Sequence, residues 1–266
     1  MENIQIYYYL WFFAIYSFIG WCSEVVYAVI TTGKFSNRGF LNGPVCPIYG
    51  FGTIIVILSL TPFRGNLLLL FTGSVLLTSI LELATGFLLE KVFHNKWWDY
   101  SDKPFNIGGY ICLSFSLMWG LGCIFVIHII HPMISYGVFS MPKLIGGGLI
   151  ALILLLLALD TASTVVSVYG FNKRLHQLDE IAAKIKNISE ELGENLTKNT
   201  LAIMEINDDV KEELGERKAE FEELITRQRE LLSRSNYVHH RLVKAFPGLK
   251  SNKFAEALEK LKQVRS

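Results

Sequence analysis

The sequence has none of the short motifs that mark the common nucleotide-hydrolysing and metal-dependent enzymes. Its 266 residues contain no Walker A loop, no HExxH zinc motif, no GxGxxG fingerprint and no nucleophile elbow. These patterns identify P-loop ATPases, zinc peptidases, dinucleotide-binding enzymes and α/β-hydrolases. The chain is therefore not itself an ATPase of the P-loop kind. No cofactor is expected, and enzymatic and non-enzymatic functions both stay open.

Cysteines are too few and too scattered for a metal site or a disulfide framework. The four of them, Cys22, Cys46, Cys112 and Cys123, show no CxxC or Cys/His spacing. Cys112 and Cys123 would lie roughly 16 Å apart on one helix, which is too far for a disulfide. Two histidines lie one helical turn apart near the end of the fourth apolar run, but no third ligand accompanies them. We expect packing cysteines and no metal.

An excess of charge of either sign is also missing. The chain has 25 basic and 24 acidic residues and a net charge of +1. There is no overall positive field to suggest nucleic acid as a partner. The first apolar run has no basic flank before it and no A-x-A site after it, so we expect no cleavable signal peptide.

Long apolar runs are what the sequence does have. Hydrophobic residues make up 51% of the chain and concentrate in residues 4–171, whereas residues 172–266 are rich in Glu, Lys and Arg. This break predicts an all-α polytopic membrane protein with a transmembrane bundle over 1–171 and a helical tail over 172–266. Pro47, Gly50 and Gly52 interrupt the second run, which is short enough to be re-entrant. We predict five spans, at about residues 6–30, 45–60, 67–92, 109–130 and 144–168, the fourth ending at His131-Pro132.

Basic residues in alternate loops predict the orientation. They follow the first, third and fifth spans, whereas the other two loops hold one each. Under the positive-inside rule the N-terminus lies outside the cell membrane and the C-terminus lies in the cytoplasm. The residues on the cytoplasmic side are Lys34, Arg38, Lys91, Lys96, Lys103, Lys173 and Arg174, against Arg64 and Lys143 outside.

The tail has helical periodicity. Apolar residues recur at three- and four-residue steps from Leu175 and resume at Ile203, with a slip near Gly193 and Asn199. Interleaved Glu and Lys are typical of a solvated helix or of a coiled coil, and a coiled coil could make a homo-oligomer. Two shorter helices are predicted at 239–246, before Pro247-Gly248, and at 252–264.

Four carboxylates lie inside or at the rim of apolar spans, where charged groups are functional candidates by default. Glu24, Glu82, Glu90 and Asp160 all fall on the cytoplasmic side of the predicted topology. Helical phase places each on a face with small or polar residues, so we expect the spans to pack around a polar cavity that opens to the cytoplasm. In the fourth span a face of small residues at four-residue steps, which includes Ser116 and Gly120, predicts close helix contact. The acids could equally be structural, paired with an arginine or hydrogen-bonded across helices.

Two polar loops would cover that cavity. The first, 34–44, offers glycine backbone and an arginine suited to phosphate or carboxylate, although this arginine could simply neutralise a span carboxylate. The second, 97–106, holds aromatic residues that could instead be interfacial anchors. The predicted substrate-binding residues are Glu24, Asn37, Arg38, Asn42, Glu82, Glu90, Trp97, Trp98, Asp99, Tyr100, Asn106 and Asp160.

Three blocks of sequence carry a family resemblance. They are GWCSE at 20–24, NRGFLNGP at 37–44 with PIYG at 47–50, and LELATG at 81–86 with WWDY at 97–100. Over about residues 7–168 the chain resembles the bacterial multi-span proteins called putative ABC-transporter type IV permeases, and RLVKAFPGLKS resembles the tails of many of them. The resemblance implies a transport component with a separate nucleotide-binding ATPase subunit. Alternatives are an embedded enzyme acting on lipid head groups, or a scaffold or sensor that recruits partners through its tail.

Overall fold

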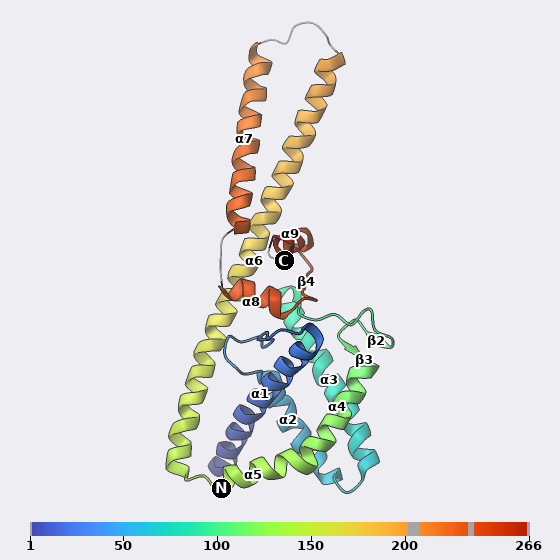
Figure 1. The fold of residues 1–266 in the computed structure, drawn as a ribbon, viewed down its shortest axis with the longest axis vertical. Helices are drawn as coiled ribbons and strands as arrows, with labels where there is room; N and C mark the ends of the chain where they lie inside the picture. The colour runs from blue at the N-terminus through green and yellow to red at the C-terminus, as the bar shows by residue number, and fades with distance from the viewer. Residues whose placement is uncertain (1, 202–207, 234–236, 265–266) are drawn as a thin grey trace. The chain divides into compact units, whose positions relative to one another are not determined.

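The computed structural model describes residues 2–201, 208–233 and 237–264 and confirms an all-α protein (Figure 1). Its contacts divide the chain into two compact units. The membrane unit comprises residues 1–167 and 241–250, and the second unit comprises 168–240 and 251–266. The membrane unit is therefore made from two segments that lie far apart in the sequence.

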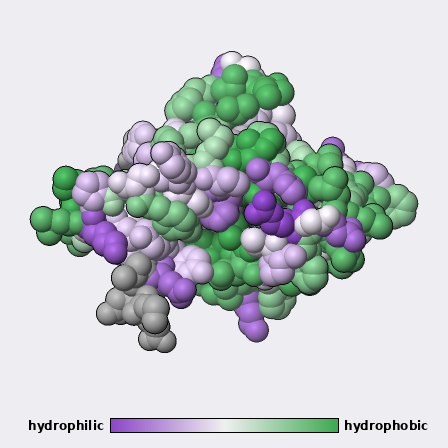
Figure 2. Space-filling model, turned by 90° about the horizontal axis from the view of Figure 1, so that it is seen from below, coloured by the Kyte–Doolittle hydropathy of each residue, from purple (hydrophilic) through white to green (hydrophobic). Residues whose placement is uncertain are grey.

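Four helical stretches in the described part of the chain are long and apolar enough to cross a membrane. They are α1 (Glu2–Thr32), α3 (Leu67–Phe93), the continuous run of α4 (Leu113–Phe125), η2 (Val126–Ile130) and α5 (His131–Phe139), and the first part of α6 (Lys143–Leu201). The predicted second span is the shorter α2 (Pro47–Leu60) with η1 (Thr61–Phe63). Large apolar side chains such as Leu68, Leu144 and Val166 are exposed. In the end-on view of Figure 2 hydrophobic residues occupy much of the rim, and hydrophilic residues gather towards the centre.

The predicted stop at His131-Pro132 is wrong. The helix passes through a π turn at Val126–Ile130 and continues to Phe139. The His131 amide donates to the Val126 carbonyl, five residues back. Pro132, which has no N–H, stands in the first turn of α5. A π turn shifts the hydrogen-bond register, and proline is tolerated in the first turn of a helix, so the chain stays helical.

Small residues bring the spans of the membrane unit close together. A Cβ on Gly50 of α2 would lie 2.7 Å from the Phe13 carbonyl oxygen of α1. Between α3 and α4, the Ser79 hydroxyl donates to Ser116 at 2.8 Å, and both Ser116 and Gly120 are buried. The predicted small-residue face of the fourth span is therefore confirmed. Such contacts replace the hydrophobic effect, which does not drive helix association in lipid.

The loops of the membrane unit contain short strands. β2 (Asn106–Ile107) pairs antiparallel with β3 (Ile111–Cys112), in the register Asn106 with Cys112. β1 (Asn95–Lys96) pairs with β4 (Lys250–Ser251), which begins at the last residue of this unit.

In the second unit, α6 continues and lies beside α7 (Asp208–Ser233), antiparallel to it (Figure 1). The Arg174 guanidinium donates to the Leu231 and Leu232 carbonyls, and Arg217 pairs with Glu191. We call α6 from Val168 onward, together with α7, the hairpin. Residues 202–207, and with them the predicted resumption of the apolar repeat at Ile203, lie outside the described residues. The shorter predicted helices correspond to α8 (Tyr237–Ala245) and α9 (Ala255–Gln263).

Candidate functional site

Glu24 on α1 is the centre of one polar group. The Tyr49 hydroxyl, on α2, donates to its Oε1 at 2.5 Å. On the other side, the Arg38 Nε lies 3.8 Å from Oε2, and the Arg38 guanidinium stands 5.1 Å from the centre of the Tyr27 ring. Three elements thus meet at one carboxylate. The predicted neutralisation of a span acid by Arg38 is what the geometry shows.

Glu82 on α3 lies next to this group. It hydrogen-bonds with Tyr100, and the charges of Glu82 and Glu24 act on each other. Burial and then these two carboxylates raise the pKa of Tyr100 well above its usual range. The phenol therefore stays protonated and can donate. Oε2 of Glu82 is buried, and no described group hydrogen-bonds to it.

Asp160 on α6 is occupied with the first loop instead. Its Oδ1 accepts from the backbone and side-chain nitrogens of Asn42 at 3.1 and 3.0 Å, and its Oδ2 accepts from the Gly43 amide at 2.7 Å. The Asn42 side chain also donates to Thr164. Asp160 thus anchors the loop to its span through Asn42, which lies four residues after Arg38.

Asn37 shapes the first loop from within. Its Oδ1 accepts from the Trp21 indole at 2.8 Å and from the Gly39 amide at 3.0 Å, and its Nδ2 donates to the Asn42 carbonyl at 2.8 Å. Two of these bonds shape the loop itself, and the bond from Trp21 ties the loop to α1.

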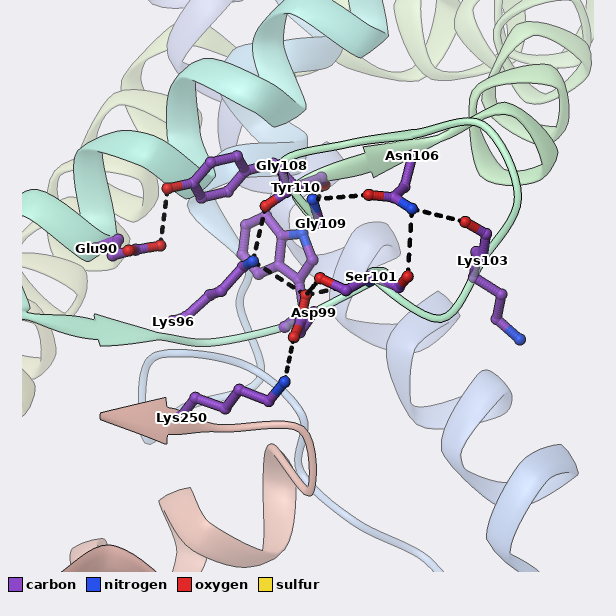
Figure 3. Close-up of polar contacts among 11 residues, drawn as sticks. Glu90, Lys96, Asp99, Ser101, Lys103, Asn106, Gly108, Gly109, Tyr110 and Lys250 are labelled. Carbon is purple, nitrogen blue, oxygen red and sulfur yellow. Dashed lines mark hydrogen bonds and ion pairs between the residues drawn. The ribbon is translucent and has the colours of Figure 1, made fainter. Parts of the chain in front are cut away.

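Asp99 organises the second loop (Figure 3). Its carboxylate accepts from Lys96 at 3.0 Å, from the Ser101 hydroxyl at 2.5 Å and from Lys250 at 2.5 Å. Burial by itself raises the pKa of Asp99, but the hydrogen bonds from Lys250, Ser101 and Lys96 outweigh it and hold the pKa well below its usual range. Gly109 has a φ of 71°, and a Cβ there would collide with the Asp99 carboxylate. The loop therefore needs glycine at this position.

The rest of the second loop folds back on itself. The Asn106 Oδ1 accepts from the Gly109 amide at 3.2 Å, and the Trp98 indole donates to the Tyr110 carbonyl at 2.9 Å. The Tyr110 hydroxyl donates to Glu90 at 2.8 Å. Glu90 is thus tied to this loop rather than to Glu24.

Trp97 is not an interfacial anchor. It is only 4% exposed and packs against Phe40, Phe93 and Phe246. Phe40 belongs to the first loop and Trp97 to the second, so this aromatic group joins the two loops.

The predicted residues therefore fall into neighbouring groups and not into one. Glu24, Arg38, Glu82 and Tyr100 come together; we call them, with Tyr49, the carboxylate site. One open hollow of about 490 Å³ in the membrane unit lies near the opposite end of α3 and is lined by apolar side chains together with Arg64 and His128. The predicted polar cavity at the acids stays a prediction.

Sequence reasoning missed several residues that complete these groups. Tyr49, within the block PIYG at 47–50, is the partner of Glu24, and Tyr110, which follows Gly108-Gly109 outside those blocks, is the partner of Glu90. Arg241 and Lys250 come from the far end of the chain, in RLVKAFPGLKS, which no periodicity connects to the loops. No group of three His, Cys, Asp or Glu side chains placed to hold a metal occurs among the described residues.

Comparison with known protein families shows which family the chain belongs to. Residues 11–165 match the family model described as putative ABC-transporter type IV. The chain belongs to this family. The match spans α1 to the membrane part of α6 and confirms the predicted resemblance. Searches of the curated proteins and of the solved structures find no match.

Proposed function

We propose that the protein is the membrane-spanning component of a transport system. The carboxylate site is the polar substrate-binding site on the transport pathway and opens towards the cytoplasm. Membership of an ABC-transporter family and four apolar spans support the membrane role. The proximity of Glu24, Glu82 and Arg38 between apolar helices is the observation that supports the assignment of the carboxylate site to transport.

Physical chemistry favours a functional role for this group. Ionisable residues within spans are expensive and mark substrate or ion paths. Packing alone does not require two carboxylates side by side, since mutual repulsion disfavours them. Glu82 also keeps one buried oxygen without a hydrogen-bond partner among the described residues, which suits a polar ligand that binds and leaves.

The energy source has to lie elsewhere, because the chain has no Walker A loop. We propose a separate nucleotide-binding ATPase subunit that docks on the cytoplasmic side, the side on which the positive-inside rule predicts the loops at 33–46 and 94–112 and the tail. Co-purification of the full-length protein with the ATPases of its own organism tests this partner. We also propose that the hairpin contacts a second copy of the chain. Sedimentation of the purified protein, which measures its oligomeric state, tests this contact.

Uptake by proteoliposomes tests the site. Full-length protein is reconstituted with a candidate ATPase, and accumulation of amino acids, sugars and organic cations is followed. We expect Glu24→Gln and Glu82→Gln to lower uptake about tenfold or more. Glu190→Gln makes the same change at an exposed hairpin residue paired with Lys186 at 3.9 Å and should leave uptake unchanged.

Two results would count against transport. One is uptake equal to that of empty vesicles for every substrate class, and the other is full uptake by both carboxylate variants. Membrane lipid composition altered by Glu82→Gln and Asp99→Asn, without any effect on uptake, would favour the lipid-directed enzyme instead.

A further inference from the structure

Residues 241–250 are part of the membrane unit, although the 73 residues 168–240 separate them from its last span. We call this segment, RLVKAFPGLK, the strap. Leu242, Ala245 and Leu249 within it are almost fully buried. The strap is therefore a docked element of the membrane unit.

One end of the strap holds the first loop. The Arg241 guanidinium is buried and donates to the carbonyls of Gly39 and Phe40 at 2.7 and 2.9 Å. These are the two residues that follow Arg38, which pairs with Glu24. A planar guanidinium bound to two successive carbonyls fixes the direction of the backbone there.

The other end holds the second loop. The Lys250 ammonium donates to Asp99 at 2.5 Å (Figure 3), and the Phe246 ring meets Trp97 edge to face at 5.1 Å. Asp99 directly precedes Tyr100, which hydrogen-bonds with Glu82. In each loop the strap thus binds next to the residue that partners a span carboxylate.

We propose that the strap is a releasable clamp that regulates the carboxylate site. Docked, it holds Arg38 on Glu24 and Tyr100 on Glu82, which closes the site. Released, it frees both loops and exposes both acids to solvent and substrate. The regulatory meaning rests on the proposed transport function, whereas the clamping itself does not.

Two native cysteines report on the clamp. Cys46 ends the first loop and is 5% exposed, and Cys112 ends the second loop and is 1% exposed. Burial, with a smaller contribution from Glu24, raises the pKa of Cys46 to about 12, so its thiol reacts slowly until the loop opens. Cys123, within α4, serves in its own single-cysteine protein as the control for general unfolding.

The experiment measures alkylation by N-ethylmaleimide of full-length protein in lipid nanodiscs, with one native cysteine kept and the other three changed to alanine. Lys250→Glu places a like charge at Asp99, and Phe246→Ala removes the ring from Trp97. Lys250→Glu loses a charged hydrogen bond and Phe246→Ala loses a large apolar contact, so we expect each to accelerate labelling of both Cys46 and Cys112 about tenfold and to leave Cys123 unchanged.

Matched controls separate the clamp from the charge change. Lys244→Glu makes the same reversal within the strap, at an exposed side chain, and should not alter either rate. Lys250→Arg keeps the charge and should label like the unmodified protein. Arg241 is left intact because its own charge lowers the pKa of Cys46.

Unchanged rates at Cys46 and Cys112 would overturn the clamp. Acceleration at Cys112 alone would reduce the strap to a local brace of the second loop and also overturn it. Equal acceleration at Cys123 would mean general unfolding and has the same consequence. Labelling does not depend on uptake, so a positive result stands even if the transport proposal fails.

Discussion

Each carboxylate in the spans meets a donor or cation from a different element. Glu24 on α1 meets Tyr49 of α2, Glu90 on α3 meets Tyr110 beyond the second loop, and Asp160 on α6 meets the first loop. A charge left unpaired in an apolar environment is strongly unfavourable. These pairs therefore fix the relative positions of helices and loops, in addition to any role in transport.

Asp160→Asn tests how much one such pair stabilises the membrane unit. An amide has a single oxygen, so its NH₂ group would face either the Gly43 amide or the donors of Asn42. We expect a loss of about 1–3 kcal/mol, the range for a buried donor left unsatisfied. Thermal unfolding in detergent measures it.

Asp102→Asn is the control for that change, because Asp102 is 73% exposed and pairs with Lys103 at 3.9 Å. Surface pairs contribute little, so its unfolding temperature should stay the same. Equal unfolding temperatures for the Asp160 variant and the parent would contradict the anchoring role.

The ion pair of Asp99 and Lys250 sets a pH window for the strap. The pKa of Asp99 is lowered, so its contribution is present above the ordinary aspartate pKa of about 4 and is lost as the pH falls below it. The pKa of Lys250 is raised by its hydrogen bond to Asp99, so its contribution is present below the ordinary lysine pKa of about 10.4 and is lost above it.

We therefore expect a constant difference in unfolding temperature between the protein and Lys250→Gln from about pH 5 to pH 9. The difference should shrink below about pH 4, where Asp99 takes up a proton in the unfolded chain while the folded ion pair is still charged. A difference that changes near neutral pH would point to another titrating group and contradict this assignment.

At the scale of elements, the backbones of α1 and α2 approach each other closely at Gly50. Gly50 allows this approach, since a Cβ there would meet the Phe13 carbonyl oxygen at 2.7 Å and would collide with the Ser17 hydroxyl. We expect Gly50→Ala to destabilise the membrane unit by about 1–3 kcal/mol through overpacking, which exceeds the gain in helix propensity.

Gly148→Ala on α6 provides the comparison. A Cβ on Gly148 meets no atom within 4 Å, and its φ is helical. This variant should be neutral or more stable by up to about 1 kcal/mol. The idea of a tight α1–α2 crossing fails if both variants unfold at the same temperature in detergent.

The sequence predicted the bounds of an element well wherever a single local signal determines where that element begins and ends. α3 begins and ends within one residue of the predicted span, because apolar composition runs from Leu67 and Asn66 caps the helix. The run through Pro132 was missed because a π turn has no sequence signature of comparable strength. The pairing of Glu24 with Arg38 was among the predicted alternatives, whereas the tyrosine partners depend on how helices rotate against each other.

At the scale of the whole molecule, the contacts that fix the two loops join residues about 150 to 200 positions apart in the sequence. Arg241 with Gly39 and Lys250 with Asp99 cannot be inferred from spacing, because helical periodicity relates only near neighbours. By the same connectivity, the second unit is covalently continuous with the strap, whose non-covalent contacts hold the two loops. It is attached to the membrane unit through α6 on one side and through the strap on the other.

Two truncations separate the strap from the rest of the tail. A chain ending at Lys250 keeps the strap and loses α9, whereas a chain ending at His240 loses both. Because the bonds of Arg241, Phe246 and Lys250 to the loops need no residue beyond Lys250, we expect Cys46 to stay as unreactive in the first truncation as in the full chain. In the second it should react about tenfold faster or more, since both loop contacts are gone at once. Equal alkylation rates in the two truncations would contradict the clamp; if both exceeded the rate of the full chain, residues beyond Lys250, and not the strap, would be what protects the first loop.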